Sequence, residues 1–356
     1  MMPGEFERHK ATVMIWPVRE GSFPNHARDA QECFRVIAEA VARHEPVYML
    51  ADLSGCTPPE ITGVTFLDLP TDDAWARDVC PTFVRQEGEV RGIDWSFNAW
   101  GGTYDGLYAS YEKDNACASK LCGMLHYPCI SAGSFVLEGG SIHSDGEGTI
   151  LTTEECLLSP GRNPDLTKDQ IEEKLKQYLG AEKVIWLPRG IIGDETNGHV
   201  DNFCAFIRPG AVVLAWADES DPEQKKVCED ALRILQTERD ARGRKIRVVK
   251  LPLPQKPVRI RKEELPLFSY EEGEKERTEG EKLAASYVNF YIANGCVVLP
   301  QFGDERDGTA LQILKDCFPD REMVPVESRA VLLGGGNIHC ITQQIPASDL
   351  KGRNSR

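Results

Sequence analysis

Short apolar runs recur in pairs along the chain, each pair separated by a turn that contains glycine. Four such pairs span residues 82–97, 141–152, 202–218 and 289–304. Apolar and polar residues alternate within the runs, as in a strand with one buried face. Pro209-Gly210 and Asn294-Gly295 stand at two of the turns, and such dipeptides between alternating runs favour β-hairpins. We therefore predict four hairpins.

After three of these hairpins the apolar spacing changes from two to about 3.6, the period of an amphipathic helix. Helices are predicted at residues 164–179, 221–236 and 307–318, and the first two begin with an acidic residue and a proline. A short apolar run with a proline follows each helix: KVIWLP, IRVVKLP and MVPV. The order strand, strand, helix, strand is thus predicted to repeat.

The N-terminal segment fits the same order with one strand missing. TVMIWP, a helix at residues 27–42 and PVYMLA supply a strand, a helix and a strand. The C-terminal run HCITQQIP can supply the missing strand, which would pair the end of the chain with its beginning and remove an exposed edge. We predict about five such units arranged radially in one domain, residues 1–356. An open doubly wound sheet fits less well, because hairpins are antiparallel and no G-x-G-x-x-G follows a strand.

The net charge of the chain limits the kinds of molecule that it is expected to bind. The 356 residues include 41 Lys and Arg against 56 Asp and Glu, a net charge of −15. Binding to nucleic acid or to anionic lipid needs a basic surface, whereas a negative field attracts cationic small molecules. No stretch approaches ~18 uninterrupted apolar residues, and the first residues lack an apolar signal core. We expect a cytoplasmic protein with no nucleic-acid and no membrane partner.

The cysteine pattern excludes two common uses of this residue. None of the twelve is spaced C-x-x-C, so neither a zinc ribbon nor a thioredoxin-type redox pair is expected. Free thiols in a reducing compartment are the default, and most serve as small buried apolar residues. They stand at positions 33, 56, 80, 117, 122, 129, 156, 204, 228, 296, 317 and 340. Local context must identify any reactive one.

The densest polar motif, GDETNGHVDN at residues 193–202, leads directly into a predicted strand. If that strand begins near Gly198, then His199 and Asp201 lie on the same face. A histidine and a carboxylate so placed can act as general base and charge partner. A polar turn that happens to contain a histidine explains the motif equally well, and metal ligation by His-x-Asp would need further ligands.

A second motif, LGGGNIHCITQQ at residues 333–344, combines three glycines with Cys340. Glycines permit close backbone approach, and Cys340 begins an alternating run. His339 is then expected to point away from Cys340, since neighbouring residues of a strand face opposite ways. A nucleophile and a buried cysteine in a bulged strand are both compatible with this motif.

Two further motifs carry carboxylates: one is a charged run with a tryptophan next to a strand, and in the other a glutamate ends an apolar run. Residues 72–78, DDAWARD, contain Asp78, and residues 136–140, VLEGG, contain Glu138. Each could instead lie in a solvated turn or in a paired buried site. A thiol, a histidine and carboxylates at strand ends suggest chemistry on a guanidinium, because paired carboxylates bind that cation and a thiolate can attack its central carbon.

Four motifs together resemble the agmatine deiminase family, a branch of the guanidino-group-modifying (pentein) superfamily: W-x-x-D at 75–78, L-E-G-G at 137–140, E-T-N-G-H-V-D-N at 195–202 and G-G-G-N-I-H-C-I-T-Q-Q at 334–344. The resemblance covers essentially the whole chain. It implies an α/β fold, a five-bladed α/β-propeller of ββαβ repeats. It also implies hydrolysis of agmatine, a small cationic substrate, to N-carbamoylputrescine and ammonia without metal or cofactor, in polyamine biosynthesis.

The resemblance assigns a role to each site residue. Cys340 would form a covalent amidino-thioether, and His199 would protonate the departing ammonia and then activate water. Asp78 and Asp201 would hold the guanidinium, while Glu138 would orient His199. Trp75 would wall the guanidinium site, and Glu195 is a weaker candidate for the ammonium end of the substrate.

Other functions remain open. A deiminase of free or peptidyl arginine is the main alternative, although the acidic loop 194–197 favours a second positive charge over a carboxylate. Amidino transfer to an amine uses the same thiol chemistry. A cysteine peptidase would need an oxyanion hole instead of carboxylates, and a non-catalytic polyamine-binding propeller would not need Cys340. A homo-oligomer is compatible with the sequence. The charged segment 263–282 is predicted as a solvated loop or frayed helix and is a candidate lid.

Overall fold

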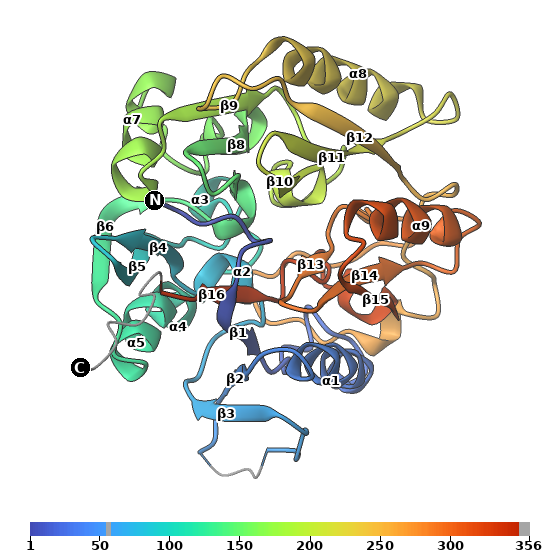
Figure 1. Cartoon of the computed structure of the whole chain (residues 1–356). Helices are drawn as coiled ribbons and strands as arrows, with labels where there is room; N and C mark the ends of the chain where they lie inside the picture. Colours follow the sequence, from blue (N-terminus) through green and yellow to red (C-terminus); the bar gives the residue numbers. More distant parts are fainter. Residues whose placement is uncertain (55–57, 349–356) are drawn as a thin grey trace.

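Five small β-sheets are arranged as a ring in the computed structural model, which describes residues 1–54 and 58–348. Figure 1 shows the sheets around a common centre, with helices such as α7 (Lys168–Leu179) and α8 (Pro222–Thr237) on the periphery. The N-terminal segment runs from the rim toward the centre before the first strand begins (Figure 1). The predicted radial arrangement, a five-bladed α/β-propeller, is confirmed.

Each sheet consists of an antiparallel pair followed by a strand parallel to the second member. This is the ββαβ order predicted from the sequence, because a parallel third strand requires a crossover such as a helix. Three sheets were predicted in full: β7 (His143–Ser144), β8 (Thr149–Thr153) and β9 (Lys183–Leu187); β10 (Cys204–Arg208), β11 (Ala211–Trp216) and β12 (Arg247–Pro252); and β13 (Tyr291–Ile292), β14 (Cys296–Gln301) and β15 (Glu322–Glu327).

The two ends of the chain meet in one sheet, as predicted. Its order is β16 (Gln343–Pro346), β1 (His9–Ile15), β2 (Val47–Ala51) and β3 (Val64–Asp68). β16 pairs antiparallel with β1, and Val13 lies opposite Gln343. The fourth strand, β3, was not predicted. It is half-exposed and pairs in parallel with β2. This sheet therefore has four strands, whereas the other four sheets have three.

The remaining sheet holds β4 (Thr82–Gln86), β5 (Glu89–Ser96) and β6 (Cys129–Val136). Its crossover contains three short helices, which is why no long amphipathic pattern marks it in the sequence. They are α3 (Gly102–Asp105), α4 (Glu112–Asn115) and α5 (Cys117–Met124). Other short helices are α2 (Ala76–Val79), α6 (Glu154–Leu157) and α10 (Arg329–Leu332), with 3₁₀ turns η1 (Gly139–Ser141), η2 (Val200–Asn202) and η3 (Leu265–Leu267).

The long crossover helices pack an apolar face against their sheets. α1 (Arg28–Ala42) buries Phe34, Ile37 and Val41, a spacing that places all three on one side of a helix. α8 begins as predicted, with the Asp221 side chain capping its first turn, and α9 (Asp307–Cys317) also matches its prediction. α7 starts four residues later than predicted, because Thr167 forms a capping box there.

The described residues include no helix long and apolar enough to cross a membrane. The segment 263–282 is a loop with only the 3₁₀ turn η3, so the frayed-helix alternative was wrong. The cysteines in the described part of the chain are all free thiols, and eight of them are buried. Cys56 lies outside the described residues.

Candidate active site

The predicted site residues lie on the segments that precede the first strand of each sheet. Asp78 precedes β4, Glu138 precedes β7, His199 and Asp201 precede β10, and Cys340 precedes β16. The first strands β4, β10 and β16 lie nearer the centre of the ring than the strands that follow them in their sheets (Figure 1), and residues far apart in sequence line one pocket. Six of the seven predicted site residues line it: Trp75, Asp78, Glu195, His199, Asp201 and Cys340.

Glu138 lies behind this pocket, in contact with His199. Its Oε2 is 3.7 Å from His199 Nε2, and its Oε1 is 2.7 Å from Arg162 Nε. Burial would raise the pKa of Glu138, but the Arg162 guanidinium and His199 hold it below its usual value. Glu138 is thus a carboxylate that can orient the imidazole, as proposed from the resemblance.

The backbone at Gly140 brings three polar side chains together. A Cβ atom there would lie 2.6 Å from His199 Nδ1 and 2.9 Å from both Asp78 Oδ1 and Asp201 Oδ2. Only a residue without a side chain fits this position, because real Cβ contacts are longer. The Gly140 amide also donates to Asp78 Oδ1 at 2.8 Å. The second glycine of the L-E-G-G motif therefore makes room for the carboxylates and the imidazole.

His199 and Asp201 do not lie on a strand, contrary to the prediction. His199 caps the 3₁₀ turn η2, which contains Asp201, and β10 starts only at Cys204. The turn, not the pleat of a strand, directs both side chains into the pocket. Burial would lower the pKa of His199, yet Asp78, Cys156 and Glu138 hold it well above its usual value. These neighbours favour the imidazolium in the ligand-free protein.

Asp78 has less compensation from positive charge than Asp201. Trp100 Nε1 donates to its Oδ2 at 2.9 Å, and His199 Nδ1 lies 4.0 Å from the same oxygen. Burial, together with the neighbouring Asp201 and Glu138 carboxylates, raises the pKa of Asp78 to about 6. A bound cation would relieve this repulsion.

Cys340 lies on a turn between α10 and β16, not within the strand as predicted. Its Sγ is 3.3 Å from Asn289 Nδ2 and 3.7 Å from Asp201 Oδ2. Burial and the Asp201 and Asp78 carboxylates raise the pKa of the thiol well above its usual value. The ligand-free site thus holds a thiol, and a cation between the carboxylates would favour the thiolate.

The three glycines before Cys340 are required by close packing at two positions and by the backbone conformation at the third. Cβ atoms on Gly334 and Gly336 would lie 2.9 Å and 2.5 Å from the Trp75 ring. Gly335 has a φ of +103°, where side chains are rarely tolerated. The indole Nε1 of Trp75 donates to Asp73 at 2.9 Å, which fixes the ring in the pocket wall.

Glu195 is already paired with two cations. Its carboxylate oxygens lie 2.7 Å from Arg277 Nη2 and 2.9 Å from Lys275 Nζ. Both residues belong to the segment 263–282, which was predicted to be solvated. Instead Glu274, Lys275 and Arg277 line the pocket, so this segment forms part of its wall.

Several residues of the site were not found from the sequence, among them Asn289 beside the thiol, Trp100 on Asp78 and Arg162 on Glu138. Asn289 is the first residue of a predicted hairpin and corresponds to Asn202 in the preceding repeat. Its position in the repeat could have identified it. Trp100 and Arg162 lie in crossovers without a repeated signal.

Two groups of side chains in the described residues bring metal-ligating atoms within 4.8 Å of one another: Glu138, Cys156 and His199, and Glu5, His143 and His339. In each group an arginine already contacts the glutamate, Arg162 in the first and Arg77 in the second. A guanidinium beside the carboxylate opposes binding of a second cation there.

Comparisons with known proteins agree with this geometry. A family model for Porphyromonas-type peptidyl-arginine deiminases matches residues 1–346. The chain is 54% identical over 354 residues to a Selenomonas ruminantium protein assigned as an agmatine deiminase, covering 97% of this chain and 95% of that one. It is 47% identical to the agmatine deiminase of Pseudomonas aeruginosa, with 97% and 95% covered. The agmatine deiminase of Enterococcus faecalis superposes with a TM-score of 0.93 at 42% identity, covering 98% and 96%.

Proposed function

The chain belongs to the Porphyromonas-type peptidyl-arginine deiminase family, and we propose that it is an agmatine deiminase that hydrolyses agmatine to N-carbamoylputrescine and ammonia. The relatives named above support this substrate. The observation that carries the proposal is the thiol of Cys340 among buried carboxylates, opposite an imidazole paired with Glu138. We further propose a single catalytic domain, located in the cytoplasm and serving polyamine biosynthesis.

Asp78 and Asp201 bind the guanidinium in this proposal. Both carboxylates are buried and line the pocket. A guanidinium presents donors in a planar fork, so two carboxylates can fix its plane. Placed between them, the cation lowers the pKa of the Cys340 thiol by the same attraction that binds it. Substrate binding and nucleophile activation are therefore coupled.

The reaction then has two steps. The Cys340 thiolate attacks the central guanidinium carbon, the His199 imidazolium donates its proton to the departing nitrogen, and ammonia leaves. Neutral His199 next removes a proton from water, whose oxygen attacks the same carbon. The carbon–sulfur bond breaks and the new hydroxyl loses its remaining proton to solvent, which releases N-carbamoylputrescine and restores the thiolate. Glu138 keeps the imidazole oriented through both steps.

Arginine is the alternative substrate, and one observation favours testing it. Lys275 and Arg277 line the pocket, where a substrate carboxylate could replace Glu195 as their partner. In agmatine the corresponding end is an ammonium, which would instead be attracted to Glu195. Arg277 also pairs with Glu281, so two carboxylates balance the two cations, and we favour agmatine.

The test is release of ammonia by the purified protein from agmatine, free arginine and an arginine peptide blocked at both ends. We expect turnover of agmatine alone. Turnover of arginine would keep the chemistry and overturn the assignment of substrate. Absence of turnover on all three compounds would contradict the proposed function.

The ionisation of Asp78 predicts an acid limit for substrate binding. Its pKa is about 6, and the protonated form cannot balance a guanidinium. We expect kcat/KM to fall by about tenfold per pH unit as the pH drops below about 6. Bound substrate stabilises the carboxylate, so the acid limb of kcat should lie at lower pH. Identical limbs in kcat and kcat/KM would contradict this.

Asp73 provides the control for that experiment. It also lines the pocket, and burial raises its pKa to about 6. Its partners are Ser22 and the Trp75 indole. Asp73→Asn should therefore retain the acid limb of kcat/KM.

A further inference from the structure

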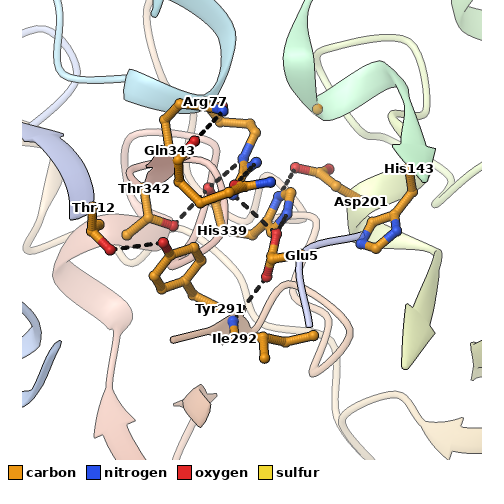
Figure 2. Close-up of polar contacts among 12 residues, drawn as sticks. Glu5, Thr12, Arg77, His143, Asp201, Tyr291, Ile292, His339, Thr342 and Gln343 are labelled. Atoms are coloured by element: carbon orange, nitrogen blue, oxygen red, sulfur yellow. Dashed lines mark hydrogen bonds and ion pairs between the residues drawn. The ribbon is translucent and has the colours of Figure 1, made fainter. Parts of the chain in front are cut away.

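His339, the neighbour of the proposed nucleophile, lies between two carboxylates. Its Nδ1 is 2.8 Å from Asp201 Oδ2, and its Nε2 is 2.8 Å from Glu5 Oε2. Figure 2 shows the ring bridging the two acids. All three side chains are at most 4% exposed. The two neighbours share a contact, because Cys340 Sγ lies 3.7 Å from the same Asp201 Oδ2.

Both contacts require His339 to donate. A neutral imidazole has one N–H, whereas an ionised carboxylate only accepts. Two carboxylates at hydrogen-bond distance therefore select the imidazolium, with a proton on each nitrogen. The other groups that face the ring are Arg77, which would disfavour the cation, and His143, whose ring stacks on it at 5.9 Å. Burial and Arg77 would lower the pKa of His339, but Glu5 and Asp201 outweigh both and raise it.

Glu5 is buried and held by two further contacts, although it belongs to the N-terminal segment. Its Oε1 accepts from the Ile292 amide at 2.8 Å, and its Oε2 lies 3.1 Å from Arg77 Nη2. Figure 2 shows these contacts on the side of His339 opposite Asp201. Burial opposes the charge, but His339 and Arg77 hold the pKa of Glu5 far below its usual value.

Asp201 differs from Asp78 because of this arrangement. Both are buried, but His339 holds the pKa of Asp201 below its usual value, whereas burial raises that of Asp78. His199 and Arg77 also favour the Asp201 carboxylate. His339 and, at 3.7 Å, the Cys340 thiol contact Asp201 Oδ2, whereas Oδ1 is buried without a hydrogen-bond partner among the described residues. An unpaired carboxylate oxygen at a pocket wall is ready for a cationic donor.

We propose that Glu5 and His339 are positioning residues for substrate binding: Glu5 holds the His339 imidazolium, which keeps Asp201 ionised with Oδ1 free for the guanidinium. This inference rests on the proposed function only in taking the bound cation to be the guanidinium of agmatine. It assigns a role in substrate binding to Glu5, which does not line the pocket and acts through His339.

The first test is the protonation state of His339 in the ligand-free protein. In ¹⁵N-histidine-labelled protein, His339 should show two protonated nitrogens at pH 7 and above. The seven histidines make the signal assignable by its loss in His339→Gln. A neutral His339 at pH 7 would overturn the proposal, whatever the substrate of the enzyme is.

The second test is the pH dependence of His339→Gln and Glu5→Gln. Without the imidazolium, burial should raise the pKa of Asp201, so the acid limb of kcat/KM moves to higher pH. Near pH 6–7 we expect KM for agmatine to rise roughly 10- to 100-fold in His339→Gln, the range for loss of a hydrogen bond to a charged group. The effect of Glu5→Gln should be smaller and of the same sign, and kcat should change less than KM in both.

Recovery at high pH separates this role from a purely structural one. KM of both variants should fall toward the wild-type value as the pH rises and Asp201 ionises again, whereas a packing defect would persist. His143→Gln is the matched control, since it removes the stacked ring but neither carboxylate contact of His339, and its acid limb should stay in place. Thermal unfolding of each variant verifies folding. An unshifted acid limb in both His339→Gln and Glu5→Gln would overturn the proposal.

Discussion

Replacing Cys340 by serine is expected to reduce agmatine turnover by a factor of about 10⁴ or more, the scale seen when a catalytic nucleophile is removed. A serine hydroxyl is far less acidic than a thiol, so the guanidinium cannot generate a comparable nucleophile at neutral pH. Agmatine should still bind, because Asp78 and Asp201 do not depend on the sulfur. Steady-state ammonia release and calorimetric titration measure the two effects separately.

Cys129→Ser is the matched control for that variant. Cys129 is an exposed free thiol on β6, and its replacement should leave turnover unchanged. Retained turnover in Cys340→Ser would contradict covalent catalysis by this residue. Loss of both turnover and binding would indicate that the substitution disturbs the pocket, and thermal unfolding of the variant would then show whether it is folded. A polyamine-binding protein without catalytic function would be unaffected by the loss of the thiol.

Replacing His199 by glutamine should lower kcat by about 10²–10⁴, the usual contribution of a general acid–base. The imidazolium supplies the proton for departing ammonia, and the neutral ring accepts one from water, so both steps lose a proton carrier. Glutamine keeps a polar side chain near Glu138 but does not titrate. The pH dependence of kcat should lose the contribution of His199.

Glu138→Gln serves as the comparison for His199→Gln. Glu138 acts through the imidazole at 3.7 Å, so its loss should reduce kcat in the same direction but by less. Single-turnover measurements of ammonia release show whether the first step is slowed. A reduction of less than about tenfold in His199→Gln would contradict its assigned role.

The architecture was largely predictable because its signals are local. Hairpin turns such as Asn294-Gly295 and the alternation of β10 and β11 are encoded within a few residues. The pairing of β16 with β1 followed from counting strands per repeat. Local competition explains the errors: Thr167 caps α7 where Pro164 was expected to begin it, and three short helices replace a long crossover before β6.

The site was predictable only in part, because its contacts join different sheets. Cys340, His199 and Glu138 stand beside glycines in dense motifs, and the motifs were recognisable without the fold. Their conformations were not: a 3₁₀ turn carries Asp201, where a strand was predicted. Neither the Arg162–Glu138 pair nor the Glu5–His339 pair, 334 residues apart, leaves any pattern in the sequence.

The pocket wall formed by residues 274–277 shows another limit. A run of glutamates and lysines predicts a solvated surface, yet Arg277 is buried against Glu195 and Glu281. Arg277 is buried because Glu195, on a loop distant in sequence, supplies the opposite charge. Whether this segment moves during catalysis stays a prediction.

The most direct test of covalent deimination is mass spectrometry of the wild-type protein after rapid acid quenching of its reaction with agmatine. We predict that the peptide containing Cys340 carries agmatine minus ammonia, the composition of an amidino-thioether. The adduct should appear during turnover, disappear when agmatine is exhausted and be absent from Cys340→Ser. Turnover without any adduct on Cys340, or an adduct on another cysteine that tracks turnover, would contradict the account.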